Sequence, residues 1–210
     1  LGAYIPTRGA IFDENGVGLT GADIQAIIRL QQRAVTYAYQ KGVTVISSAG
    51  NDTNNGQKDG SAINLPADLA HVVNISSTAP IGWATDPTAT NLDNLASYSN
   101  FGNTIDFAAP GGDFVYSGNE VCVVAGLARP CWVFDLVFST SNGGWSWSAG
   151  TSMASPHAAG VAALIIEKNG GDMSPAQVEA VLKQSADDIF KPGFDPYSGA
   201  GRVNAYNAVK

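Results

Sequence analysis

A serine lies at the start of a segment in which small residues follow one another closely. The segment reads GTSMASPHAAG from Gly150 to Gly160, and its pattern predicts a helix over residues 151–168. A serine in the first turn of a helix lies at the positive end of the helix dipole, and its own N–H can point toward an oxyanion formed on an acyl substrate. These properties make Ser152 a nucleophile, an anion-binding group or an ordinary helix cap.

A serine hydroxyl that acts as a nucleophile needs a general base within hydrogen-bond reach. The chain holds two histidines, His71 and His157. His157 lies five residues after Ser152 on the predicted helix, about 140° around the axis and roughly 7.5 Å along it, so it cannot reach the hydroxyl. His71 precedes a buried strand without flanking carboxylates, and we expect it to have a packing or surface role. The sequence therefore offers no base for Ser152.

Sequence signals upstream of the serine predict a helix followed by a buried strand. Thr20 and Asp23 have the spacing of a capping box at a helix start, and Gly42 suits the end of that helix. Val43–Ser48 is a β-branched run without polar alternation at its first four positions, as in a strand buried on both faces. The polar loop that follows, Asn51–Gly60, lies where ligands of open α/β sheets tend to bind.

The rest of the chain continues the alternation of helices and strands. Strands are predicted at residues 71–77 and 104–108, and a final helix capped at Ser174 runs to about Ile189. Pro156 falls early in the serine helix, where N–H groups lack partners, so we expect its missing donor to cost little. Alternating helices and buried strands predict an α/β fold with a parallel sheet.

Residues 111–148 interrupt this pattern. They hold both cysteines, Cys122 and Cys131, and three of the four tryptophans, with little periodicity. We interpret them as an excursion with its own small core, including a hairpin around residues 132–140, in preference to an aromatic ligand platform. The cysteines are either buried free thiols or a disulfide, which would stabilise a short loop by at most about 3 kcal/mol. The ligands of a zinc site are missing.

Composition narrows the class of protein. A chain of 210 residues, with 45% hydrophobic and 14% charged residues, can form one substantial domain with a core. A net charge of −7 argues against nucleic-acid and anionic-membrane partners, and no apolar run approaches the roughly 20 residues of a membrane span. The chain opens without an initiator Met or a signal-like segment, so we expect a processed start or a piece of a longer chain.

The full string GTSMASPHAAGVAALI resembles the serine motif of the subtilisin-like serine proteases (subtilases, peptidase family S8). The resemblance implies that Ser152 is the nucleophile and that Gly150 and Thr151 shape its turn. The string VTVISSAGN, residues 43–51, resembles the family strand whose final asparagine completes the oxyanion hole. Asn51 alone would be interpreted as a turn residue, but the resemblance implies that it donates to the oxyanion together with the Ser152 N–H.

The resemblance also implies a substrate-binding region. The small residues Ser48, Ala49 and Gly50 would form one wall of the primary specificity pocket. Leu1 and Gly2 resemble the end of the family segment that pairs with an extended substrate backbone. Further matching stretches extend the resemblance over nearly all of the chain except the excursion.

The aspartate and histidine motifs of the family are missing from this sequence, and the family places both N-terminal to the segment found here. The resemblance therefore implies that residues 1–210 are the C-terminal part of one subtilisin-like peptidase domain. Its fold would be a three-layer α/β fold whose parallel sheet lacks its first strands. We expect the chain to bind the missing N-terminal half as a processed fragment, or to be excised from a longer chain, and to be inactive alone.

The implied function is that of a secreted, extracellular serine endopeptidase that hydrolyses polypeptide substrates through an acyl-enzyme, with Cys122 and Cys131 in a disulfide. The alternative is a non-catalytic member of the fold that binds peptides or acts as an assembly module. A third interpretation, a phosphate or nucleotide site at Thr151–Ser152, is disfavoured because the sequence lacks the glycine-rich phosphate loop with a lysine that such a site requires.

No cofactor is expected in this portion of the domain. Calcium is common in the family, and we expect it in the complete protein, at sites that involve the missing portion. Asp52, Asp59 and Asp113 are interpreted as solvated loop charges, so no metal ligand is assigned to them.

Overall fold

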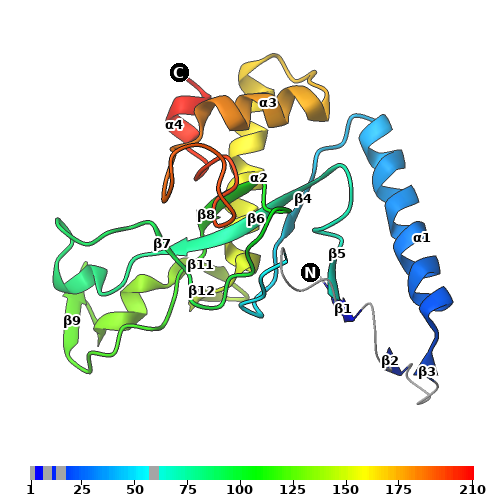
Figure 1. Ribbon diagram of the computed structural model, residues 1–210. Coiled ribbons are helices and arrows are strands. Elements are labelled where there is room, and N and C mark those ends of the chain that lie inside the picture. The colour runs from blue at the N-terminus through cyan, green and yellow to red at the C-terminus, as the bar shows by residue number, and fades with distance from the viewer. Residues whose placement is uncertain (1–2, 7–10, 13–17, 57–61) are drawn as a thin grey trace.

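The computed structural model describes residues 3–6, 11–12, 18–56 and 62–210, and the chain within them is arranged around one mixed sheet (Figure 1). Strand β6 (Val72–Ala79) is buried along its whole length and lies at the centre. It pairs in parallel with β4 (Val45–Ser48) and with β8 (Phe107–Pro110), and antiparallel with the two-residue β7 (Asn94–Leu95). The predicted parallel sheet is therefore confirmed for three strands, and β7 makes it mixed.

Helices lie on both faces of this sheet. Because neighbouring side chains of a strand point to opposite faces, Val72 and Val73 of β6 enter different cores. Val73 joins the larger core, against α2 (Thr151–Lys168) and α3 (Pro175–Ser185), and Val72 joins a smaller one beneath α1 (Gly21–Gln40). Figure 1 shows α1 standing apart from the other helices. The arrangement is the α/β class that the sequence predicts.

Local signals place the helix ends well. The capping boxes at Thr20 and at Ser174 are both present, and α2 has the predicted bounds. Helix α3 ends at Ser185 instead of near Ile189. The interpretation of Pro156 is wrong: it is an interior residue of α2, and the hydrogen bond it cannot make is the one to the Ser152 carbonyl.

The first predicted strand is less buried than expected. Strand β4 begins at Val45, while Val43 is 52% exposed. All four residues of β4 pair with β6, but only the last two, Ser47 and Ser48, are buried. The strand expected at residues 104–108 begins three residues later, as β8.

The excursion forms two hairpins instead of the one expected. Residues 132–140 do not form a hairpin, because η2 (Cys131–Asp135) is a 3₁₀ turn. The remaining elements of the excursion are the pairs β9 (Val121–Val124) with β10 (Leu127–Pro130), and β11 (Val137–Ser141) with β12 (Gly144–Ser148). A disulfide joins Cys122 to Cys131, which confirms that pairing.

The small elements complete the description. Strand β1 (Ala3–Pro6) pairs antiparallel with β5 (Ala62–Leu65), and β2 (Ile11–Phe12) pairs with β3 (Gly18–Leu19). A 3₁₀ turn, η1 (Trp83–Thr85), follows β6, and a short helix, α4 (Ala205–Ala208), is the last element of the chain. In the part of the chain that is described, every helix is too short or too polar to cross a membrane.

Candidate active site

Ser152 is the second residue of α2 and is exposed to solvent. The first-turn N–H groups of a helix have no partner within the helix, so the Ser152 N–H is free to bind an anion there. The N-cap is Gly150, which has no side chain to occupy that end. A cavity of about 350 Å³ opens beside Ser152, with Met153 and His157 among its lining residues. The serine is therefore accessible to a substrate.

Asn51 follows β4 and is fixed to the same helix terminus. Its Oδ1 atom accepts two hydrogen bonds from Thr151, from the backbone N–H at 3.0 Å and from the hydroxyl at 2.7 Å. The Thr151 hydroxyl in turn accepts from the Gly50 N–H at 3.2 Å. Because Oδ1 faces both donors, the Asn51 Nδ2 group is directed away from them, toward solvent. The amide therefore presents its N–H₂ group.

The side-chain nitrogen of Asn51 and the backbone nitrogen of Ser152 lie near one point in space. A β-carbon placed on Gly150 would lie 3.4 Å from Asn51 Nδ2 and 3.6 Å from the Ser152 nitrogen. Gly150 also has a φ of +154°, which residues with a side chain rarely adopt. Because residue 150 is a glycine, no side chain occupies this point near the two nitrogens and the Met153 sulfur. These distances place residues 51 and 152 near each other, and their expected joint role at an oxyanion stays a prediction.

Asn100 holds the loop that carries Asn51, and sequence reasoning missed it. Its side-chain carbonyl accepts from the N–H groups of Asp52 and Asn54, each at 2.9 Å, and its amide donates to the Ala49 carbonyl at 2.9 Å. Asn100 is 7% exposed. The sequence gives no local signal for this role, because the contacts of Asn100 join it to residues 46 to 51 positions away.

The proposed wall of the specificity pocket is close-packed. Ser48 and Ala49 are buried, and Ala49 lines a polar cavity of about 50 Å³ that Asn64 and Asn100 also line. A β-carbon at Gly50 would lie 2.5 Å from the Asn100 amide nitrogen, so glycine is required there. Leu1 and Gly2 lie outside the described residues. The substrate-binding role of all five residues stays a prediction.

Both histidines have other contacts. The Nδ1 atom of His157 lies 2.8 Å from the Met153 carbonyl oxygen, one turn back on α2. His71 stacks on Tyr39 of α1 with ring centroids 4.1 Å apart, and it lines a different cavity from Ser152. The expected packing role of His71 agrees with this stacking.

The loop aspartates differ from the expectation in one case. Asp113 is wrongly interpreted as a solvated charge: it is 2% exposed and accepts hydrogen bonds from the Ser97 and Phe114 N–H groups. Asp52 is exposed, and Asp59 lies outside the described residues. Among the described residues, no three His, Cys, Asp or Glu side chains gather as a metal site would require. Calcium in the complete protein stays a prediction.

The buried Tyr98 and the half-buried Asp106, both near the sheet, have shifted pKa values. Burial raises the pKa of Tyr98 to about 12, so its hydroxyl stays protonated and donates to the Gly112 carbonyl at 2.5 Å. Burial also raises the pKa of Asp106 to about 6, against the effect of a hydrogen bond from the Asn74 N–H. Tyr98 therefore anchors the segment that leaves β8 toward the excursion.

The helices on both faces of this sheet, with Ser152 and Asn51 at the N-terminus of α2, are the features to compare with known proteins. Residues 16–201 match the model of the subtilase family, peptidase family S8, and the chain belongs to this family.

Curated relatives and solved structures agree with the assignment. The chain is 33% identical to Thermitase of Thermoactinomyces vulgaris over 179 residues, which are 85% of this chain and 48% of that protein. It is 37% identical to the Extracellular protease of Xanthomonas campestris over 85% of this chain and 25% of that protein. The epidermin leader peptide processing serine protease of Staphylococcus aureus has a TM-score of 0.74 and 26% identity, over 100% of this chain and 49% of its own. The chain thus spans half or less of these proteins.

Proposed function

We propose that this chain carries the nucleophile and the oxyanion hole of a subtilisin-like serine endopeptidase. The single observation that supports the proposal is that Asn51 Nδ2 and the Ser152 nitrogen lie 3.4 Å and 3.6 Å from the point where Gly150 lacks a β-carbon. A carbonyl oxygen held there would accept from both donors while its carbon lay next to the Ser152 hydroxyl. Removal of the corresponding asparagine from a subtilisin, a relative of this chain, lowers kcat by roughly 10²–10³.

The reaction proceeds in two halves. The Ser152 Oγ atom attacks the scissile carbonyl, the Ser152 proton passes to a histidine, and the oxyanion rests on Asn51 and the Ser152 N–H. Collapse of the tetrahedral intermediate breaks the C–N bond, and the histidine returns the proton to the leaving amine. Water then hydrolyses the acyl-enzyme by the same route.

The histidine and the aspartate that orients it come from outside these 210 residues. His157 has its ring nitrogen at the Met153 carbonyl, and His71 is stacked on Tyr39. The cavity beside Ser152 offers about 350 Å³ in which an imidazole from the rest of the domain can approach the hydroxyl. On this proposal the chain acts together with the N-terminal part of the domain, and it is inactive by itself.

The substrates are polypeptides, and the site of action is extracellular. The Cys122–Cys131 disulfide supports an oxidising compartment, where such bonds persist. The acidic composition also disfavours a nucleic acid as the partner.

A non-catalytic peptide-binding member of the fold is the second candidate. It would need neither an accessible Ser152 nor an oriented Asn51 amide, yet the chain has both. A fluorophosphonate probe separates the two candidates, because it labels only an activated serine.

The test combines the chain with the N-terminal part of the domain. We expect the probe to label Ser152, Ser152→Ala to abolish the label, and the isolated 210 residues to hydrolyse no peptide. A folded, complete domain that stays unlabelled would favour the non-catalytic candidate. Hydrolysis by the isolated chain that disappears in Ser152→Ala would show that no outside base is needed.

A further inference from the structure

The excursion contains a large cavity that the proposed chemistry does not use. Its volume is about 640 Å³, which lies within the range of small-molecule and side-chain sites. Four aromatic side chains line it, together with small polar residues. They are Phe114, Tyr116, Trp132 and Trp147. We call this space the aromatic cavity.

The walls of the aromatic cavity are held from several directions. Trp132 directly follows Cys131, whose sulfur is tied to β9 by the disulfide. Trp147 packs against Phe138 with ring centroids 4.5 Å apart, and the Arg129 guanidinium lies 5.8 Å from the centre of the Trp147 ring. Tyr116 donates a hydrogen bond to Glu120. These contacts hold the Trp147 and Tyr116 side chains and the segment that carries Trp132.

Two buried carboxylates fasten the excursion to the body of the domain. Asp113 accepts from the Ser97 N–H at 2.5 Å, and Asp135 accepts from the Gly82 and Trp83 N–H groups at 2.6 and 2.8 Å. Asp135 is 3% exposed. The aromatic cavity is thus part of a rigid wall and not of a free loop.

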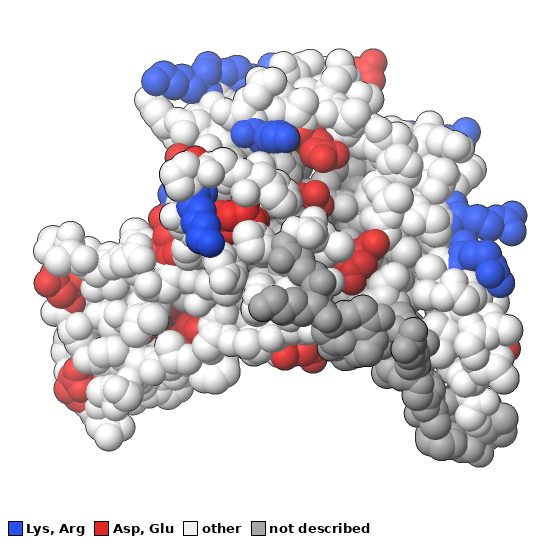
Figure 2. All heavy atoms as spheres, viewed as in Figure 1, with Lys and Arg blue, Asp and Glu red and all other residues white. Residues whose placement is uncertain are grey.

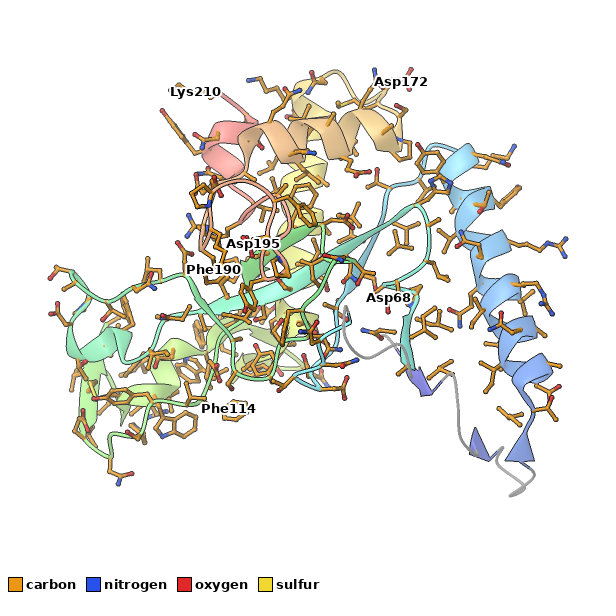
Figure 3. All side chains as sticks on the ribbon, viewed as in Figure 1. Asp68, Phe114, Asp172, Phe190, Asp195 and Lys210 are labelled. Atoms are coloured by element: carbon orange, nitrogen blue, oxygen red, sulfur yellow. A yellow bond between two sulfur atoms is a disulfide. The ribbon has the colours of Figure 1, made fainter. Side chains whose placement is uncertain are left out.

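The surface of the aromatic cavity suits an apolar side chain. Phe114 is 60% exposed although it is aromatic, and Figure 3 shows its side chain directed away from the sheet. In the view of Figure 2 the surface over the excursion is mostly uncharged, with a few acidic side chains. Uncovered aromatic surface of this kind is stabilised when an apolar group displaces water from it.

The position of the aromatic cavity connects it with Ser152. Ser148 and Ala149 line it, and they lead directly into Gly150 at the oxyanion space. Gly50, which follows Ala49 in the proposed wall for the acyl side of the substrate, donates to the Thr151 hydroxyl at the same helix terminus. An extended substrate that runs through the oxyanion space therefore passes from the Ala49 wall to the Ser148 wall.

We propose that the aromatic cavity is a specificity pocket for a large apolar or aromatic side chain on the leaving-group side of the scissile bond. The inference rests on the proposed function and adds to it a class of substrate: polypeptides with such a residue within a few positions after the cleaved bond. Burial of one such side chain predicts a roughly 10-fold preference in kcat/KM over alanine.

The experiment uses the complete domain with internally quenched peptides that differ in one residue. In the peptides, Phe replaces Ala at one of the first three positions after the cleaved bond. A p-nitroanilide with the same acyl part is the control substrate, because it has no residue after the cleaved bond. Two variants act on the cavity: Phe114→Ala removes an exposed wall, and Ser117→Trp fills the space. Trp145→Ala is the matched control, because Trp145 is 67% exposed in the same excursion and does not line the cavity.

We expect the wild type and Trp145→Ala to prefer Phe at one position, and both cavity variants to reduce that preference to about twofold or less. Anilide hydrolysis should be unchanged in all of them. Preference for Phe that survives in both cavity variants would overturn the inference and leave the proposed function intact. A wild type that cleaves neither peptide nor anilide would overturn both. A dimer that dissociates in Phe114→Ala, with unchanged peptide preference, would assign the cavity to a second copy of the chain.

Discussion

The Asn51 side chain is held by Thr151 through two hydrogen bonds to one oxygen atom, from the Thr151 N–H at 3.0 Å and its hydroxyl at 2.7 Å. Thr151 is 1% exposed, so water does not compete for these bonds. The two contacts direct the Asn51 oxygen toward Thr151 and leave its N–H₂ group for the proposed oxyanion. Thr151 is therefore a positioning residue for the proposed oxyanion donor.

Replacing Thr151 by valine tests this role. The Thr151→Val side chain keeps its shape but loses the hydroxyl donor, and the lost bond of about 1–1.5 kcal/mol should lower kcat by roughly 10-fold. KM should change little, because the oxyanion exists only in the transition state and the intermediates. Thr151→Ser restores the hydroxyl and is the control. Steady-state kinetics with an anilide give both constants, and an unaltered kcat in Thr151→Val would contradict the role.

Gly150→Ala should lower activity more than Thr151→Val does. The new methyl group would occupy the point that lies 3.4 Å from Asn51 Nδ2 and 3.6 Å from the Ser152 nitrogen. It blocks the carbonyl oxygen of the substrate, and the φ of +154° adds strain. We expect kcat/KM to fall by at least about 10²-fold, which is the loss of one full oxyanion donor. Gly160→Ala, in the same helix with open space around it, is the matched control. Near-normal activity of Gly150→Ala would mean that the oxyanion lies elsewhere.

Asn100→Ala should affect stability and catalysis together. It leaves the N–H groups of Asp52 and Asn54 without their buried acceptor, at a cost of about 2–4 kcal/mol in the free energy of unfolding. Because the same loop carries Asn51, we expect kcat to fall as well. Asn91→Ala, on an exposed turn, should change neither by much. Urea unfolding and anilide kinetics measure the two effects. Lower stability with an unaltered kcat would leave Asn100 a purely structural role.

Asp106 should make stability depend on pH. Its folded pKa of about 6 lies above the ordinary value of 3.8, so the folded state holds the proton more tightly than the unfolded state does. This contribution is fully present below about pH 4 and is lost as the pH rises through about 6. Asp106→Asn should therefore match the wild type at pH 4 and be more stable at pH 8, by at most about 3 kcal/mol. Urea unfolding across this range checks the sign. A wild type that gains stability relative to Asp106→Asn as the pH rises would refute it.

The disulfide should stabilise the excursion locally. Its removal in Cys122→Ala with Cys131→Ala releases a short loop, and the chain-entropy estimate for such a loop is about 2–3 kcal/mol. We expect limited proteolysis to cut within residues 121–130 while the core around β6 stays intact. Anilide hydrolysis should persist, because Ser152 and Asn51 are held by the sheet and α2. Loss of that hydrolysis in a folded double variant would show that the excursion supports the oxyanion hole.

Short-range signals in the sequence determined the helices. The caps at Thr20 and Ser174 and the bounds of α2 depend on residues within one turn of each other, so the sequence alone predicts them. The motif around Ser152 also indicates the family, which the comparisons establish. The two hairpins of the excursion have no such signal. The course of these hairpins depends on the disulfide and on the hydrogen bonds of the buried Asp113 and Asp135. The hydrophobic periodicity of the sequence does not predict such contacts.

Only the tertiary structure decided how the site is oriented. The bonds between Thr151 and Asn51 join residues 100 apart in the chain, and Asn100 reaches the Asp52 loop across 48 residues. The sequence names the amide at position 51, but the end of that amide that faces the substrate depends on which donors surround its oxygen. Side-chain direction is set by packing between distant segments, and those segments meet only when α2 lies against the sheet.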